Sequence, residues 1–530
     1  MAGAGDEPEG SRKRKPTDEV LDEVAAGDVR TVTKGGAVQI AGQLSQRGLS
    51  SVFTFIAFRI LGRVGYGVYR EVAQVATIAG QLGLAGFNYA SMRWISRARA
   101  KGTIGGVKGA ASVGLFGIGI TSTIVAIAMV VLADPLAEAF DTGDVDESEL
   151  AGYIRLAAPY VPLFALMQVL RYCTQAYKTM VPSVIAGNIV QPVVRFVIGV
   201  AVLGAGLEVA GAVGSLVVSV AAGAIAAGFF FKRMLGEQER AAAPRREVGP
   251  MVRFALPQAG ASLLGIQTLG VGVIVLGLAS GPDQVGIFGL ALALQGAGTV
   301  FLGGMVNIWA PVVSDLYDRD AIDRLGSLYQ TLTRWISTFS LPVYAALILE
   351  PDLFAEFGGP EGKGAAPVVA ILAIGNVFYS ATGPTGYVIS MSGHPTVNLM
   401  NSVVAVGLYT AIGLPVAEAH GAVGVAVVDA AVTALINSAR VLQAWILVGV
   451  QPFGPTFYKP VVATISGSAV LLLWRLWPGD SIPLEIGGVV VSAAVFLAVL
   501  RAFGLDSEER YVWASIRRRL SRKGSRKIDS

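Results

Sequence analysis

The chain has few of the residues that form covalent cross-links or bind metal ions. Its 530 residues include one cysteine, Cys173, and two histidines. A single cysteine excludes an intramolecular disulfide, and two histidines beside it do not favour a metal site. We therefore expect neither a metal nor another cofactor in this protein.

Charged residues are also scarce. Only 15% of the residues are charged, whereas 53% are hydrophobic, 66 are glycine, and the mean hydropathy is +0.61. This composition excludes an ordinary soluble protein and indicates a polytopic membrane protein whose partners include lipids and not nucleic acid. The first thirty residues lack an apolar core after a basic start, so we expect a retained tail and no cleavable signal.

Apolar segments long enough to cross a bilayer recur along the chain, since about 20 apolar residues cover a hydrocarbon core of about 30 Å. We count fourteen, at 34–61, 66–90, 107–132, 153–176, 181–204, 209–231, 251–278, 286–309, 330–349, 365–388, 397–415, 421–445, 459–476 and 484–503. The sequence therefore predicts an all-α polytopic fold with about 14 transmembrane helices.

Charges in the connecting segments alternate in sign. Basic residues cluster at 93–108, 232–246, 319–324 and 510–527, whereas acidic residues cluster at 134–149 and 350–361. Cytoplasmic loops attract Lys and Arg. We therefore expect a plasma-membrane protein with both termini in the cytoplasm.

Short sequence echoes divide the apolar segments into two sets of six. They pair 65–69 with 285–288, Asn188 with Asn401, and 211–214 with 421–424. Because six is even, both sets enter the membrane from the same side, which predicts two parallel lobes with a binding site between them. The expected divisions are a disordered cytoplasmic tail (1–31) with an acidic, helix-compatible patch at 17–28, an N-terminal lobe (32–235), a cytoplasmic linker (236–250), a C-terminal lobe (251–448), two extra helices (459–503) and a basic cytoplasmic tail (504–530).

The first apolar segment carries a polar stripe in mid-span. Gln43, Gln46 and Arg47 belong to it, at spacings of three and four residues that bring side chains to one side of a helix. An arginine at the bilayer centre costs about 2.5 to 3.5 kcal/mol on insertion scales. Arg47 should therefore face a bundle interior or a hydrated cavity, and it has no acidic residue on its own helix.

Other spans carry similar stripes. They comprise Glu71, Gln74, Gln81 and Asn88 in the second span, Asn188, Gln191 and Arg195 in the fifth, and Asp429, Thr433, Asn437 and Arg440 in the twelfth. A cavity whose central charges are mainly arginines suits phosphate, and its amides suit hydroxyl groups. A phosphate-bearing sugar lipid meets both conditions. Five arginines lie near predicted helix ends, where long basic side chains are expected to reach the interface: Arg59, Arg155, Arg171, Arg253 and Arg440.

The chain resembles the Wzx-type polysaccharide flippases, in the superfamily that also holds lipid II flippases and multidrug and toxin extruders. The segments that carry the resemblance are KGGAVQIAGQLSQRGLS, FRILGRVGYGVY, MVRFALPQAGASLLG, GPDQVGIFGLALAL, the stretch from WAPVVSDLYDRD to STFSLPV, and the turn at 393–395. Together they spread the resemblance over about residues 31–503.

The resemblance implies a V of two lobes that moves a polyprenyl-(di)phosphate-linked oligosaccharide to the outer leaflet, alongside other polysaccharide-assembly proteins. It makes Arg47 and Arg253 candidates for contacting phosphate or sugar, and 459–503 a groove for the lipid tail. Many relatives carry an acidic residue in the seventh span, whereas 269–277 is uncharged here. Ion coupling through that helix is therefore in doubt.

Three alternatives stay open. The first is a lipid II flippase, which the sequence hardly distinguishes from a flippase for a polyprenyl-linked oligosaccharide. A cation-coupled drug exporter needs deep carboxylates, and Asp429 alone qualifies as a candidate for ion coupling. A membrane glycosyltransferase needs a general acid or base on a substantial outer loop, but the longest outer loops, 133–152 and 350–364, are short.

Overall fold

A computed structural model describes residues 16–143, 145–263, 270–476 and 481–504. In this part of the chain every regular element is helical. The helices are α1 (Pro16–Leu84), α2 (Phe87–Ala100), α3 (Ile104–Val131), α4 (Ala133–Ala139), α5 (Glu147–Ala157), α6 (Tyr160–Gln175), α7 (Val181–Val184), the π-helix η1 (Ile185–Val190), α8 (Gln191–Gly204), α9 (Glu208–Met234), α10 (Glu237–Ala241), α11 (Val248–Leu263), α13 (Val271–Ala279), α14 (Pro282–Asp318), α15 (Ile322–Leu349), α16 (Pro351–Ala355), the 3-10 turns η2 (Glu356–Gly358) and η3 (Pro360–Ala365), α17 (Ala366–Thr382), α18 (Thr385–Met391), α19 (Pro395–Val448), α20 (Tyr458–Trp474) and α21 (Ile482–Ala502).

The protein is an all-helical polytopic membrane protein. In the described residues nine helical stretches are long and apolar enough to cross a membrane. The helices α1 and α19, of 69 and 54 residues, far exceed the length of a single crossing. Each bends at a glycine with positive φ, Gly62 (φ 70°) and Gly421 (φ 53°), a conformation in which a side chain would be strained.

Two details differ from the sequence-based expectations. The helix α1 begins at Pro16, so 16–31, expected within a disordered tail, is helical; proline suits a first helical position, and acidic residues stabilise a helix N-terminus. The predicted span 365–388 breaks after α17, because Gly383 has φ of 63° and Pro384 cannot donate a backbone hydrogen bond. Residues 1–15 and 505–530, the greater parts of the expected tails, lie outside the described residues.

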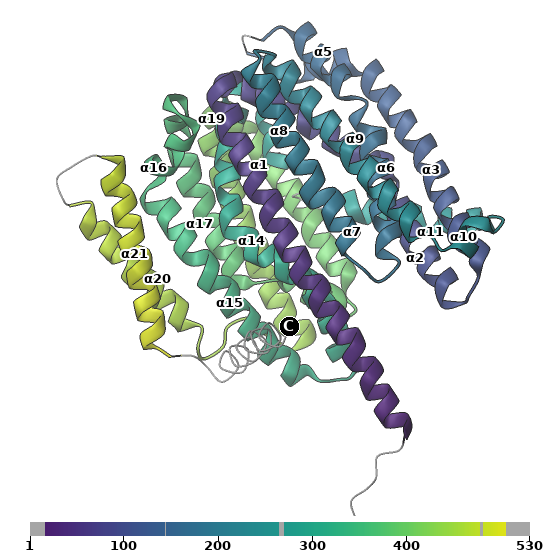
Figure 1. Ribbon diagram of the computed structural model, residues 1–530. Coiled ribbons are helices and arrows are strands. Elements are labelled where there is room, and N and C mark those ends of the chain that lie inside the picture. The colour runs from purple at the N-terminus through teal and green to yellow at the C-terminus, as the bar shows by residue number, and fades with distance from the viewer. Residues whose placement is uncertain (1–15, 144, 264–269, 477–480, 505–530) are drawn as a thin grey trace, which may run out of the picture.

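The long helix α1 lies between two groups of helices (Figure 1). We call residues 63–84 of α1, after the bend, together with α2–α9 the N-terminal group, and α13–α19 the C-terminal group. The helix α8 runs beside the first arm of α1, and α14 packs along its other side. The pair α20–α21 packs on α15 at the flank of the C-terminal group. Adjacent residues of α1 can therefore face different groups.

The two groups meet closely at the end of the bundle that holds the Gly62 bend, which we call the kink end. A Cβ on Gly67 would lie 1.7 Å from the carbonyl oxygen of Pro282, and one on Gly286 would lie 2.0 Å from that of Arg63. Gly286 follows Gly67 by 219 residues, and Pro282 follows Arg63 by the same 219. The contact is therefore reciprocal, as in a two-fold interface.

The segment that joins α9 to α11 lies at the opposite end, the linker end, and is packed against α3. The backbone N–H of Arg245 donates to the carbonyl of Gly105 (2.9 Å), and the amine of Lys108 donates to the carbonyl of Arg240 (2.8 Å). A Cβ on Gly109 would lie 1.8 Å from the carbonyl oxygen of Arg245, so glycine permits this approach. The connection is thus held on the N-terminal group.

Candidate functional site

Arg47 lies on the first arm of α1, at the boundary with the C-terminal group. Its guanidinium donates to the carbonyl of Gly296 (3.2 Å) and to the hydroxyl of Thr299, both on α14. Gln43, one turn earlier, lies with Arg47 against Gly303. The side chain is only partly buried, and no carboxylate among the described residues pairs with it. No described side chain therefore neutralises its charge.

Gln46 faces the N-terminal group and joins a chain of hydrogen bonds. Its side-chain oxygen accepts from the amide of Asn188 (2.7 Å), and the Asn188 oxygen accepts from the guanidinium of Arg171 (2.9 Å). Arg171 also donates to Gln168 (2.9 Å) and to the carbonyl of Ser183 (3.1 Å). The expectation that Arg171 reaches the interface is wrong, because these neutral oxygens hold its guanidinium inside the N-terminal group.

The π-helix η1 shapes this network. Pro192 has no N–H to donate to the carbonyl of Asn188, four residues earlier, and the preceding turn is wider than an α-helical one. Gly187 lies beneath Arg171, where a Cβ would be 2.2 Å from the guanidinium carbon. The wide turn and the missing side chain together make room for a buried guanidinium.

Two other arginines expected at the site lie elsewhere. Arg195 donates to the hydroxyl of Tyr69 and lies over the rings of Phe53 (5.0 Å) and Tyr69 (5.7 Å). It shares with Asn188 the side of the fifth span that faces α1, as its spacing predicts. Arg253 is exposed on α11. No hydrogen bond or ion pair described here joins either residue to Arg47.

The remaining predicted site residues lie in several places. Gln74 packs against Gly270 at the start of α13, and Gln81 lines a cavity described below. Asp429 lies within the C-terminal group, with its carboxylate beside the hydroxyl of Tyr409. Gln43 therefore lies with Arg47 toward α14, Gln46 and Asn188 form a separate network on the other side of α1, and Asp429 belongs to neither.

A buried acid at the kink end is a further finding. Glu71 is 1% exposed, and neither of its carboxylate oxygens has a hydrogen-bond partner among the described residues. It lies against Gly277 of α13, whose carbonyl accepts from the backbone N–H of Asp141 (2.7 Å). Sequence reasoning placed Glu71 on a polar stripe but gave it no role, because its isolation depends on the packing of the two groups.

A cavity of about 180 Å³ lies between the N-terminal group and Ala259 of α11, and we call it the Tyr89 pocket. Its polar lining comprises Gln81, Asn88, Tyr89, Gln168 and Tyr172. The rings of Tyr89 and Tyr172 meet edge to face, with centroids 4.9 Å apart. Since Gln168 also binds Arg171, the pocket adjoins the hydrogen-bonded network.

A second cavity, of about 570 Å³, lies in the C-terminal group, and we call it the Tyr379 pocket. Tyr379 comes from α17, Tyr387 from α18, and Asn398, Asn437 and Arg440 from α19. Arg440 lines this cavity and its Nε is buried without a partner, so the expectation that it reaches the interface is wrong. The break between α17 and α18 positions the two tyrosines on adjoining helices.

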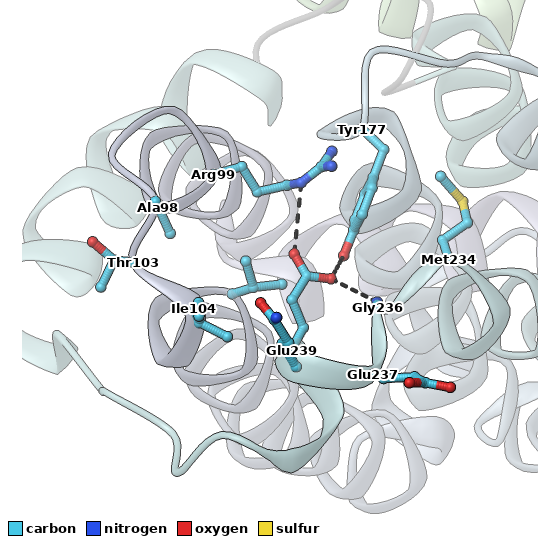
Figure 2. Close-up of a pocket in the computed structure, with 12 residues that line it drawn as sticks. Ala98, Arg99, Thr103, Ile104, Tyr177, Met234, Gly236, Glu237 and Glu239 are labelled. Carbon is cyan, nitrogen blue, oxygen red and sulfur yellow. Dashed lines mark hydrogen bonds and ion pairs between the residues drawn. The ribbon is translucent and has the colours of Figure 1, made fainter.

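A third hollow, of about 580 Å³, lies at the linker end (Figure 2). Glu239 accepts from the hydroxyl of Tyr177 (2.8 Å) and the backbone N–H of Gly236 (3.0 Å), and it pairs with Arg99 at 3.6 Å. The guanidinium of Arg99 also lies 3.8 Å from the Tyr177 ring centroid. These charged groups satisfy one another, so the hollow offers a ligand little unpaired charge.

The model of the polysaccharide biosynthesis protein family matches residues 32–317, more than half of the chain. The chain belongs to that family. Among curated proteins none matches the chain significantly.

Several solved structures share this fold. The lipid II flippase MurJ in an inward closed conformation is 12% identical, with a TM-score of 0.69 over 88% of this chain and 98% of that one. An inward-facing multidrug resistance MATE family transporter is 15% identical, with a TM-score of 0.63 over 78% and 98%. A MOP superfamily transporter from Pyrococcus furiosus is 16% identical, with a TM-score of 0.55 over 80% and 96%. The family member described here therefore has a MATE/MurJ-like fold.

Proposed function

We propose that this protein is a flippase that carries a polyprenyl-(di)phosphate-linked oligosaccharide from the cytoplasmic to the outer leaflet for cell-surface polysaccharide synthesis. The observation that carries the proposal is Arg47, a cation at the boundary of the two helix groups whose described partners are neutral oxygens. A guanidinium fork fits phosphate oxygens. The family and its superfamily support a lipid-linked cargo.

The architecture we propose has fourteen spans. Two six-helix lobes, 32–235 and 251–448, are joined by a cytoplasmic linker, 236–250, and followed by two helices within 459–503. The glycine bends of α1 and α19 and the reciprocal contact at an offset of 219 residues support a parallel repeat. The charge pattern supports cytoplasmic tails at 1–31 and 504–530.

Transport would proceed by rocking of the two lobes around a hydrated cleft, while the lipid tail remains in the bilayer. Arg47 would contact the phosphate, with Gln43, Gln46 and Asn188 positioned to bind hydroxyl groups. We extend the proposed substrate path to Gln74, Gln81, Arg195 and Arg253. Closure at the kink end would leave access from the linker end, which the charge pattern assigns to the cytoplasm.

Arg47→Ala tests the proposal in vesicles that contain only this protein and a labelled polyprenyl-diphosphate-linked sugar. We expect outer-leaflet delivery to fall at least about tenfold, since one charge-assisted contact is worth roughly 1.5 to 3 kcal/mol. Arg47→Lys should fall nearly as far if bidentate phosphate binding matters. Arg233→Gln, an exposed change at the end of α9, is the control. Normal delivery by well-inserted Arg47→Ala would refute the role.

A cation-coupled exporter is the second candidate, and Asp429 beside Tyr409 in the membrane interior favours it. Such coupling uses carboxylates at depth. Asp429→Asn should abolish cation-dependent efflux of a small drug if this candidate is right. If the flippase proposal is right, no such efflux appears in the parent protein.

A further inference from the structure

The Tyr379 pocket is an assembled cavity within the C-terminal group. Three helices supply its lining, α17, α18 and α19, and Leu302 of α14 closes one side. The hydroxyl of Tyr329 on α15 donates to the carbonyl of Thr382 (2.9 Å) and forms a hydrogen bond with the Thr385 hydroxyl (2.5 Å). These bonds fix the turn between α17 and α18. A volume of about 570 Å³ is in the range of small-molecule sites.

The lining combines aromatic rings with amides. Tyr379 and Tyr387 present flat apolar faces with a hydroxyl at the tip, the amphipathic surface that suits a sugar ring. Asn398 donates to Ser390 (3.0 Å) but its own side-chain oxygen is buried without a partner. Asn437 supplies a second amide. These groups can both donate and accept hydrogen bonds, as hydroxyl groups require.

Arg440 gives the pocket a positive charge that the described residues do not neutralise. Its Nε is buried without a hydrogen-bond partner, and it forms no ion pair with a described carboxylate. Arg99 in the hollow at the linker end differs, because Glu239 pairs with it. A planar guanidinium in a polar pocket matches a carboxylate in bidentate geometry.

The Tyr379 pocket adjoins the boundary where Arg47 lies. Leu302, which lines the pocket, directly precedes Gly303, against which Arg47 packs. The Tyr379 phenol is within electrostatic range of both Arg47 and Arg440. Tyr387 lies near Tyr89 of the N-terminal group, on the other side of the boundary. A ligand bound at Arg47 can therefore extend into the pocket.

We propose that the Tyr379 pocket binds a sugar residue of the cargo and that Arg440 selects an acidic sugar, a uronate, through its carboxylate. This inference rests on the proposed function, in which Arg47 binds the diphosphate. In this arrangement Tyr379 and Tyr387 contact the ring and Asn398 and Asn437 its hydroxyl groups. The two arginines then bind different anionic groups of one molecule, Arg47 the diphosphate and Arg440 the carboxylate.

Three short-chain polyprenyl diphosphates test the proposal: one without sugar, one with a glucosyl residue and one with a glucuronosyl residue. Binding to the full chain in lipid nanodiscs is measured by microscale thermophoresis, with empty nanodiscs subtracted. The parent protein should bind the glucuronosyl ligand about tenfold more tightly than the glucosyl one, as expected for one charge-assisted pair. Arg440→Gln should remove that difference and leave the affinity for the sugar-free diphosphate unchanged.

Further variants separate this inference from the proposed function. Arg47→Ala should weaken all three ligands alike, and Tyr387→Ala, at a residue 40% exposed, should weaken both sugar ligands only. Arg233→Gln should change nothing. If the three ligands bind through Arg47 but the parent does not prefer the glucuronosyl ligand, or Arg440→Gln keeps that preference, the uronate site is refuted and the flippase proposal stands. If none of the three binds, the flippase proposal itself fails.

Discussion

The N-terminal and C-terminal groups place matched residues in unlike surroundings. Asn188 bonds to a buried arginine, whereas Asn401, at the equivalent repeat position, exchanges hydrogen bonds with Gln443 (2.6 and 3.1 Å). Glu71 is a buried acid, whereas Leu290, 219 residues later, is a buried aliphatic residue. The backbone contact at the kink end is shared by both groups. Symmetry is thus retained where the groups touch and lost where polar side chains lie.

The largest effect is expected from breaking the shared contact. Gly67→Val would drive a side chain into the Pro282 carbonyl, 1.7 Å from the first added atom. The two groups must separate there, which costs about 1 to 3 kcal/mol or more, so transport in vesicles should fall at least about tenfold. Gly286→Val should act alike, because its clash with Arg63 is the counterpart.

The control for this change is Gly119→Val in α3, where an added Cβ meets no atom within 4 Å. It should transport normally. An equal loss of transport in Gly119→Val would mean that valine disturbs these helices wherever it is placed. If Gly67→Val kept both the transport rate and the melting temperature of the parent protein, a closed contact at the kink end would be contradicted.

A smaller effect is expected when aspartate replaces the matched asparagines, and the change in fold stability should have opposite signs in the two groups. Asn188→Asp places a carboxylate 2.9 Å from the buried guanidinium of Arg171 and should stabilise the fold by about 1.5 to 3 kcal/mol. Asn401→Asp faces Gln443 and gains no cation, so it should destabilise the fold. Thermal unfolding in detergent measures both.

Asn188→Asp should also reduce binding of a sugar-free polyprenyl diphosphate, because it lowers the positive charge near Arg47. A gain in melting temperature together with weaker binding would indicate that the network is kept neutral for the ligand and not for stability. If both aspartates destabilised the fold equally, the proposed difference between the asparagines would be wrong.

The smallest effect on stability is expected from replacing Glu71 by leucine, the residue at the matched position of the C-terminal group. Glu71→Leu copies Leu290 and removes two buried carboxylate oxygens that have no described partner, so the melting temperature should rise by the equivalent of about 1 to 3 kcal/mol. Glu147→Leu, an exposed change at the start of α5, should not alter it. A fall for Glu71→Leu would indicate that the carboxylate is bound in the parent protein.

Several elements could be predicted from the sequence because their physical signals are local. The polar stripe of Gln43, Gln46 and Arg47 indicated a helix whose side chains avoid lipid, and they contact helices on both sides. The spacing of Asn188 and Arg195 predicted a common face toward another helix, and both contact α1. Periodicity and the cost of charge in lipid suffice for such inferences.

Arg171 and Arg440 could not be placed in the same way. Their nearness to predicted helix ends favoured the interface, but the choice depends on where neighbouring helices leave space. For Arg171 that space comes from a π-helix and from Gly187, and for Arg440 from the break after α17. Both depend on tertiary packing that has no signal in a single sequence.

The strap of residues 240–245 along α3 has a mechanical consequence. Because Gly105 and Gly109 admit its backbone and the amine of Lys108 donates to it, this part of the connection is fixed to α3. Arg246 donates to the hydroxyl of Ser112 on α3 (3.2 Å), and Glu247 accepts from the indole N–H of Trp94 on α2 (2.9 Å), so the connection stays on the N-terminal group up to the residue before α11. The proposed motion between the lobes would then have to bend the chain where α11 begins, with no free linker to absorb it.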